Sequence, residues 1–332
     1  MKTHYTIPFF IPHEGCPFRC VFCDQGGITG EKGVDPGEVA EKIEKYLATI
    51  PSEGVSVEVG FFGGTFTGIP RALQDSYLEA VQEYFAAGRI QGIRLSTRPD
   101  YIDEDTLEFL KHRRVTCIEL GVQSMSDSVL AAAGRGYMAA DVERASRMIS
   151  GRGFLLVHQM MLGLPGSTFE EEWFTAHKAK ELGALQVRIY PVIVMKGTAL
   201  AVLWKAGKYA PLSEEEAVRR CAEIILYFEL NGIRVIRCGL HPSEGLLDGS
   251  AWLAGPFHPA LRQKAESRIF GLLLERALEK AEDGVQDITY NPLDEAAFFG
   301  YEKENLSLIN RISGDGRCSV RKDGSVPRRS IK

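Results

Sequence analysis

The feature that most constrains this chain is a group of three cysteines near its N-terminus. They lie in the segment C-P-F-R-C-V-F-C, where three residues separate Cys16 from Cys20 and two separate Cys20 from Cys23. Thiolates are soft ligands that suit iron–sulfur clusters and zinc. A closed zinc site needs a fourth ligand, and although His13 is near, no second pair of closely spaced cysteines follows in the sequence. The spacing therefore favours an iron–sulfur cluster held by three thiolates, with one iron open to a small ligand. A zinc site and three incidental buried cysteines are the weaker alternatives.

The composition is that of a globular protein: 45% of the 332 residues are hydrophobic and 25% are charged. No segment approaches the roughly 18 consecutive apolar residues of a membrane span, and no signal peptide is recognisable. Seven cysteines, three of them clustered, indicate a reduced, cytoplasmic protein rather than a disulfide scaffold. The net charge of −5 gives no overall basic field for nucleic acid, but residues 311–332 carry seven Lys or Arg against two Asp. We expect this basic tail to be flexible, with an RNA contact as the alternative.

Strand patterns alternate with helical patterns along the first two thirds of the chain. Such alternation predicts parallel βα repeats, and glycine-rich or polar loops follow the carboxyl ends of the strands, where barrel folds place their chemistry. Six units are too few for a closed eight-stranded barrel. We therefore expect an α/β fold with a partial (βα)6 barrel over residues 1–210, and an open doubly wound sheet is the alternative. A small α/β extension with a strand at 233–238 is expected over residues 211–310, before the tail 311–332. The six predicted barrel strands are 7–12, 55–62, 93–97, 115–121, 154–161 and 185–190.

The cysteine spacing, with the aromatic Phe22 between the last two cysteines, resembles the signature of the radical S-adenosylmethionine (SAM) enzymes. In that family the amino and carboxylate groups of SAM chelate the open iron of a [4Fe–4S] cluster. One electron then cleaves SAM to methionine and a 5′-deoxyadenosyl radical. The resemblance implies that Cys16, Cys20 and Cys23 hold the cluster, that SAM is a cofactor, and that reduced flavodoxin or ferredoxin donates the electron.

Other motifs carry the resemblance further. Gly63, Gly64 and Thr65 follow the strand 55–62, where the family's glycine pair presents backbone groups to the amino group of SAM. A plain strand-to-helix turn is the alternative reading. The run E-L-G-V-Q-S-M-S-D-S-V-L-A-A-A-G-R resembles the branch that contains the oxygen-independent coproporphyrinogen oxidases and the catalytic subunit of Elongator. In that branch the Gln and the Arg contact the ribose and the carboxylate of SAM, which implies these roles for Gln123 and Arg135.

Two positions separate this chain from the porphyrin enzymes. Ser96 and Gln159 stand where the coproporphyrinogen-oxidase pattern has Glu and Asp, and we expect both to line SAM. The segments S-T-R-P-D, M-L-G-L-P-G and R-I-Y-P-V-I-V-M-K-G-T instead resemble the Elongator barrel, so the resemblance covers about residues 7–209. It implies that Phe22 and Leu164 lie near the adenine. The first cysteine gap is narrower than in Elongator, and no acyl-CoA pattern follows Leu212, so we expect no acetyltransferase domain.

The substrate is less constrained than the cofactor. We expect Tyr190, at the end of the sixth strand, and Lys196 to face it, although a packed tyrosine and a surface lysine are the plain alternatives. The Elongator resemblance favours a nucleoside in tRNA. A small metabolite or a tetrapyrrole is the alternative within the superfamily, and a haem- or metal-binding module is the non-enzymatic one. The remaining cysteines other than Cys318 are predicted to be buried apolar residues.

Overall fold

The computed structural model of the protein describes residues 3–11, 16, 20–24, 33–51, 53–280, 287–313 and 319–332. His13 and Cys318 lie outside the described residues. Among the described helices, none combines the length and the apolar character that crossing a membrane would require.

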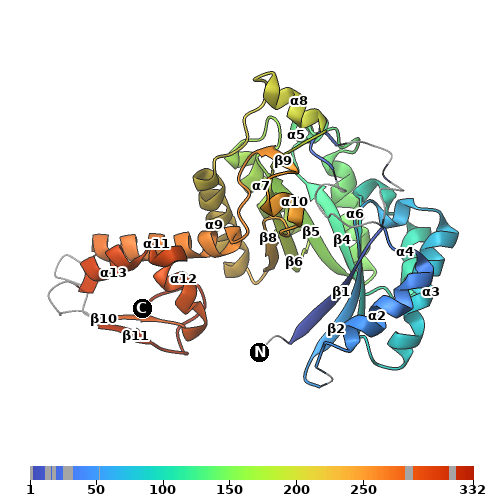
Figure 1. Cartoon of the computed structure of the whole chain (residues 1–332), viewed down its shortest axis with the longest axis horizontal. Coiled ribbons are helices and arrows are strands. Elements are labelled where there is room, and N and C mark those ends of the chain that lie inside the picture. The colour runs from blue at the N-terminus through green and yellow to red at the C-terminus, as the bar shows by residue number, and fades with distance from the viewer. Residues whose placement is uncertain are drawn as a thin grey trace.

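The centre of the molecule is a curved sheet of seven parallel strands, which forms a partial barrel (Figure 1). The six predicted barrel strands are all present and lie side by side in chain order, which confirms the partial-barrel prediction. A seventh strand, β8, pairs with β6 and forms the edge of the same sheet, although its residues fall in the segment that we expected to form the extension. The strands are β1 (His4–Phe10), β2 (Ser56–Phe62), β3 (Gly92–Thr97), β4 (Cys117–Gln123), β5 (Leu155–Leu162), β6 (Gln186–Pro191) and β8 (Arg234–Cys238).

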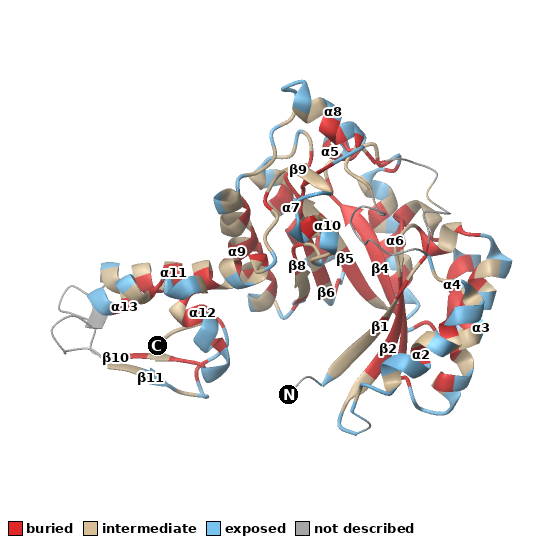
Figure 2. Cartoon of the chain, viewed as in Figure 1, coloured by how far each residue is buried: buried red, intermediate tan, exposed pale blue. Residues whose placement is uncertain are grey.

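Helices cover the outer face of the sheet, and the buried residues concentrate where strands and helices meet (Figure 2). Period-two alternation along each strand sends side chains such as Ile7 and Phe9 outward into this core. Several helices begin at the predicted caps: the side chain of Thr168 accepts from the backbone of Glu171, and that of Ser213 accepts from Glu216. The covering helices are α2 (Val39–Leu47), α3 (Arg71–Ala86), α4 (Glu104–His112), α5 (Asp127–Ala132), α6 (Ala139–Gly151), α7 (Phe169–Glu181) and α9 (Glu214–Leu230).

Short elements close the loops around the barrel. A small antiparallel pair joins β7 to β9, and 3-10 turns precede or follow several helices. These elements are β7 (Val194–Met195), α8 (Ala199–Lys205), α10 (Glu244–Leu247), β9 (Trp252–Ala254), η1 (Pro36–Glu38), η2 (Phe66–Gly68) and η3 (Pro99–Tyr101). Two further 3-10 turns, η4 (Pro292–Asp294) and η5 (Tyr301–Lys303), belong to the C-terminal lobe.

The C-terminal residues form a separate lobe beside the barrel (Figure 1). Its core holds Tyr290 stacked on Phe298, with ring centroids 4.1 Å apart. The first half of its long helix, including Leu261, packs into the barrel core, and the second half packs into the core of the lobe. The predicted basic tail contributes a strand to this lobe, while its flexibility and the three domain boundaries stay predictions. The lobe consists of α11 (Leu261–Lys280), β10 (Asp287–Tyr290), α12 (Glu295–Phe299), α13 (Leu306–Ser313) and β11 (Ser319–Lys322), with β10 parallel to β11.

Candidate functional site

The described cysteines of the motif lie beyond the carboxyl end of β1. Cys20 is buried, whereas Cys16 and Cys23 are half-buried. The backbone N–H of Cys23 donates to the carbonyl of Cys20 over 3.0 Å, so these two residues form a turn. The Sγ of Cys16 lies 3.0 Å from the Oγ1 of Thr65, a fully buried residue of the loop that follows β2. The structure therefore brings the cysteine loop and the Gly-Gly-Thr loop together, as a shared cofactor site requires.

The three thiols influence one another electrostatically. Burial, and then the charges of Cys20 and Cys16, raise the pKa of the Cys23 thiol to about 12. In the described part of the chain, no group of three histidine, cysteine or carboxylate side chains is arranged to hold a metal ion. Positively charged iron would favour the thiolate form that burial disfavours, so this donor set fits an iron–sulfur group.

Arg135 extends its side chain to the cysteine loop. It is buried, and its Nη1 donates to the Sγ of Cys20 over 3.0 Å. Its Nη2 donates to the carbonyl of Gly121 over 3.0 Å, and its Nε to the hydroxyl of Tyr137 over 2.8 Å. Although burial opposes its charge, the neighbouring Tyr137 and Cys20 keep the pKa of Arg135 above its usual value. A permanent guanidinium charge therefore lies against a predicted cluster ligand, where a cofactor carboxylate would also be attracted.

Gln123 ends β4 in a strained conformation. Its φ of 63° is in the left-handed region, and the register with β5 shifts between Gly121 and Gln123. Such irregularities re-aim side chains next to active sites. Among the described residues, its buried Oε1 is one of a few side-chain atoms that lack a hydrogen-bond partner. An unsatisfied acceptor at the carboxyl end of the sheet fits a hydroxyl donor such as those of the SAM ribose.

Ser96 and Gln159 lie together on the inner face of the barrel. The Nε2 of Gln159 donates to the Oγ of Ser96 over 3.3 Å and to Glu119 over 2.8 Å. Phe22 packs against the apolar cluster that contains the buried Leu164. These four predicted cofactor residues thus fall into two pairs, one polar and one apolar, while their contacts with SAM stay predictions.

The backbone of the glycine loop also suits a cofactor. Gly63 and Gly64 have φ values of 82° and 52°, which residues with a Cβ atom rarely adopt. Two successive residues in this region expose main-chain groups at the carboxyl end of β2. The turn therefore requires glycine at both positions, and its contact with SAM stays a prediction.

The two predicted substrate residues differ in their surroundings. Tyr190 is half-buried on β6, where burial raises its pKa and the charge of Arg188 lowers it. Lys196 is exposed between β7 and α8, and its charge acts on Asp248. In the described part of the chain, no contact ties the Lys196 ammonium to the barrel interior.

The sequence analysis missed a network of charged side chains inside the barrel. Glu119 is fully buried and accepts from the Nη1 of Arg94 at 2.8 Å and from the Nε and Nη2 of Arg188 at 2.7 and 2.8 Å. Arg94 also donates to Glu58 over 2.8 Å. A signal was present in the sequence, because each of these residues interrupts a predicted buried strand, where charged residues are rare unless paired.

The network fixes the charge of Glu119. Burial alone would raise the pKa of this carboxyl, but the guanidinium groups of Arg188 and Arg94 together hold it below the ordinary value. The middle of the barrel is therefore an ionic layer. Ser96 and Gln159 lie level with it, because they pair with Glu119 and Arg188, whereas Gln123 and the glycine loop lie at the carboxyl ends of their strands.

Comparisons with known proteins agree with this arrangement. A tRNA uridine(34) acetyltransferase of Methanocaldococcus jannaschii is 28% identical over 254 residues, which are 64% of this chain and 46% of that protein. Elongator complex protein 3 of Schizosaccharomyces pombe is 26% identical over 211 residues, 58% of this chain and 39% of that protein. This chain therefore spans less than half the length of these two curated relatives.

The fold is shared with a solved structure. Elp3 of Methanocaldococcus infernus with an N-terminal deletion superimposes with a TM-score of 0.64 at 20% identity, over 82% of this chain and 64% of that chain. Residues 185–270 match the family model of the Radical_SAM C-terminal domain. Residues 10–179, just over half of the 332 residues, match the model of the radical SAM superfamily. The chain therefore belongs to the radical SAM superfamily.

Proposed function

We propose that this chain holds a [4Fe–4S] cluster through Cys16, Cys20 and Cys23 and reductively cleaves SAM there. Membership of the family implies both cofactors. The observation that carries the assignment is the convergence of two segments on the cysteine loop: Thr65 contacts Cys16, and Arg135 contacts Cys20. When bound, the cluster supplies the electron that releases a 5′-deoxyadenosyl radical from SAM, with reduced flavodoxin or ferredoxin as the donor.

The protein's own residues orient the cofactor and exclude water. Arg135 attracts the SAM carboxylate with a charge that its buried hydrogen bonds hold in place. The Oε1 of Gln123 accepts from a ribose hydroxyl, and the Ser96–Gln159 pair lines the ribose from the neighbouring strands. Phe22 and Leu164 provide an apolar surface for the adenine. Gly63 and Gly64 present backbone groups to the SAM amino group.

The substrate that we propose is a nucleoside in tRNA, modified in the cytoplasm. Support comes from the relatives, one of which is named as a tRNA uridine(34) acetyltransferase. Tyr190, on the inner face of β6, and Lys196, beyond β7, are the residues that we expect to face this substrate.

The experiment is anaerobic reconstitution with iron and sulfide, followed by reduction, addition of SAM and detection of 5′-deoxyadenosine. We expect the wild type to form the product and Cys20→Ala to form none. Cys221→Ala, which alters a buried cysteine of α9, should retain both the visible absorption of the cluster and the product. One tightly bound zinc per chain without SAM cleavage would contradict the proposal.

A further inference from the structure

The edge strand β8 contains an irregularity that changes where its side chains point. Val235 pairs with Val187, but the next pair is Arg237 with Arg188, so Ile236 is an extra residue in β8. In a regular strand, residues three apart lie on opposite faces. The bulge therefore places Arg234 and Arg237 on the same face of the sheet.

Their partners on β6 identify that face as the interior of the barrel. Arg234 pairs with Gln186, whose side-chain oxygen accepts from Arg94 over 3.2 Å. Arg237 pairs with Arg188, whose guanidinium binds the buried Glu119. Both arginines of β8 thus share the face that carries the ionic network of the barrel.

The charge of these two arginines is not balanced by the acids around them. Inside the barrel, the carboxylates of Glu58 and Glu119 offset the charges of Arg94 and Arg188. Among the described residues, the side chains of Arg234 and Arg237 have neither a hydrogen bond nor an ion pair. Arg234 is exposed, but Arg237 is half-buried, and a half-buried guanidinium without a counter-charge costs free energy unless an anion binds to it.

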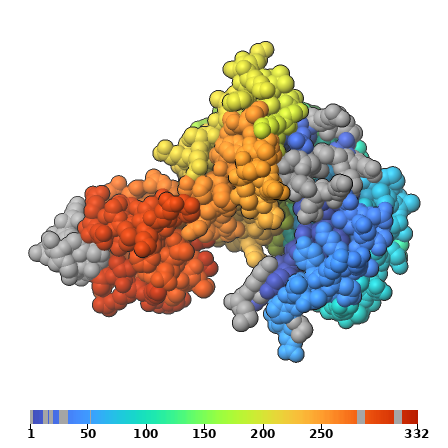
Figure 3. All heavy atoms as spheres, viewed as in Figure 1, coloured from blue at the N-terminus to red at the C-terminus, as the bar shows by residue number. Residues whose placement is uncertain are grey.

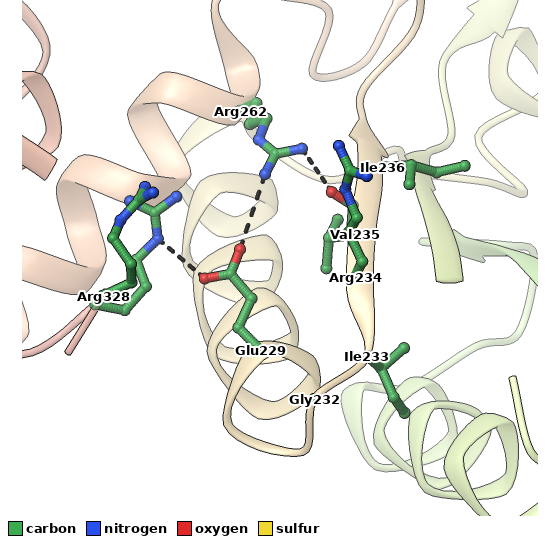
Figure 4. Close-up of a pocket in the computed structure, with 9 residues that line it drawn as sticks. Glu229, Gly232, Ile233, Arg234, Val235, Ile236, Arg262 and Arg328 are labelled. Carbon is green, nitrogen blue, oxygen red and sulfur yellow. Dashed lines mark hydrogen bonds and ion pairs between the residues drawn. The ribbon is translucent and has the colours of Figure 1, made fainter. Parts of the chain in front are cut away.

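A pocket of about 610 Å³ opens beside the same strand. It lies where β8 and α9 meet the C-terminal lobe (Figure 4). In the space-filling view the molecule is hollowed between this lobe and the N-terminal part of the barrel (Figure 3). Figure 4 shows Arg262 reaching from α11 to Glu229 and to the carbonyl of Val235, which accepts over 2.7 Å. The pocket is lined by Glu229, Gly232, Ile233, Arg234, Val235, Ile236, Arg262, Arg328 and Arg329.

In this pocket, too, acids and arginines balance except for Arg234. Glu229, Glu266 and Asp294 form ion pairs with Arg262, Arg328 and Arg329. The three acids therefore offset these three arginines. The positive charge that remains, in the pocket and in the barrel interior, is that of Arg234 and Arg237 on the edge strand β8.

Arg237 connects the pocket with the barrel interior. Burial lowers its pKa, Tyr190 partly opposes this shift, and the like charges of Arg188 on the inner side and Arg262 on the pocket side add to it. Arg237 thus has a like charge on each side, and together with Arg234, which lines the pocket, it forms a basic path along the edge strand. An anion bound beside Arg237 would relieve the repulsion between these like charges.

We propose that Arg234 and Arg237 bind phosphate groups of the substrate and guide it from the pocket across β8 into the barrel. Guanidinium groups suit phosphate because their donors match its oxygens. Two cations on one strand match successive phosphates of a polymer better than one metabolite, so RNA is the favoured source, a choice that rests on the proposed function. Phosphate recognition itself rests only on β8 and the pocket.

The test measures binding by the full chain, with a short single-stranded oligouridylate and with uridine 5′-monophosphate as probes. We expect Arg237→Gln to weaken oligouridylate binding by about tenfold at low salt, the loss of one charge-assisted contact. The slope of log affinity against log salt should fall by about 0.7 for each lost contact with a single strand. Arg147→Gln is the matched control, because Arg147 lies on α6, outside the pocket and the basic tail, with its side chain 67% exposed.

The outcomes distinguish RNA from a phosphorylated metabolite as the ligand, and they test phosphate binding independently of SAM cleavage. Arg237-dependent binding of oligouridylate identifies RNA, and Arg237-dependent binding of the monophosphate alone identifies a phosphorylated metabolite. Three results would overturn the inference: binding that is unchanged in Arg237→Gln, an equal loss of binding in Arg147→Gln, or no binding of either probe. If Arg237→Gln lowers the melting temperature, Arg234→Gln, at an exposed position, replaces it. SAM cleavage is assayed separately, so either proposal can fail while the other stands.

Discussion

Replacing Glu119 with glutamine should destabilise the protein strongly, because it removes the only acid that pairs with Arg188 among the described residues. The carboxylate of Glu119 is fully buried and accepts four hydrogen bonds, two from Arg188 and one each from Arg94 and Gln159. After the substitution Arg94 keeps Glu58, whereas Arg188 keeps no counter-charge. Removing one partner of a buried ion pair lowers the free energy of unfolding by about 3–5 kcal/mol.

The magnitude can be converted into a melting temperature. For 332 residues the unfolding entropy is about 0.7 kcal/mol/K, so a loss of about 4 kcal/mol lowers the melting temperature by about 6 °C. Differential scanning calorimetry of Glu119→Gln measures this shift. The control is Glu108→Gln, because Glu108 forms an exposed ion pair with Arg152 that should contribute little.

Two further measurements test whether the loss of ion pairs causes the lower melting temperature of Glu119→Gln. The double variant Glu119→Gln with Arg188→Gln should recover part of the lost stability, since it leaves fewer uncompensated buried charges. The folded-state pKa of Glu119 lies below its ordinary 4.5, so its contribution is fully present above that pH and is lost as the pH falls through the folded-state pKa. A Glu119→Gln protein that melts within about 1 °C of the wild type would refute the reasoning.

Two other predictions concern the cofactor site and a buried histidine. Arg135→Lys should weaken SAM binding in equilibrium dialysis by about tenfold or more, because lysine cannot reproduce the guanidinium contacts, whereas the exposed Arg152→Lys should not. Burial lowers the pKa of His158 from 6.5 to about 3, so the unfolded state binds more protons between these pH values. The free energy of unfolding therefore decreases by about 1.4 kcal/mol for each unit by which the pH is lowered in that range. His158→Gln should reduce this dependence in denaturant titrations, and His112→Gln, at an exposed position, should leave it unchanged.

The sequence was most informative where local chemistry decides structure. The cysteine spacing and the glycine pair could be read as a cofactor site, because a ligand set or a left-handed turn needs particular residue types at fixed positions. Alternating patterns located the strands, including β8. They could not show that β8 extends the barrel, since the strand pattern records burial and not the pairing partner.

The parts that could not be predicted depend on contacts between distant segments. Arg94, Glu119 and Arg188 come from three strands, and only the folded sheet reveals that their charges compensate one another. The bulge in β8 is similar, because the extra residue Ile236 is defined by the register with β6. Hydrophobic periodicity contains neither kind of information.

The helix α11 gives the molecule a mechanical property. Its 20 residues form a rod about 30 Å long, with one half in the barrel core and the other in the core of the lobe. The helix therefore couples the lobe to the barrel, and a tilt of about 10° at the barrel end would carry the far end of the rod about 5 Å. A ligand that shifts Arg262, near the start of α11, would therefore also displace the far end of the helix within the lobe.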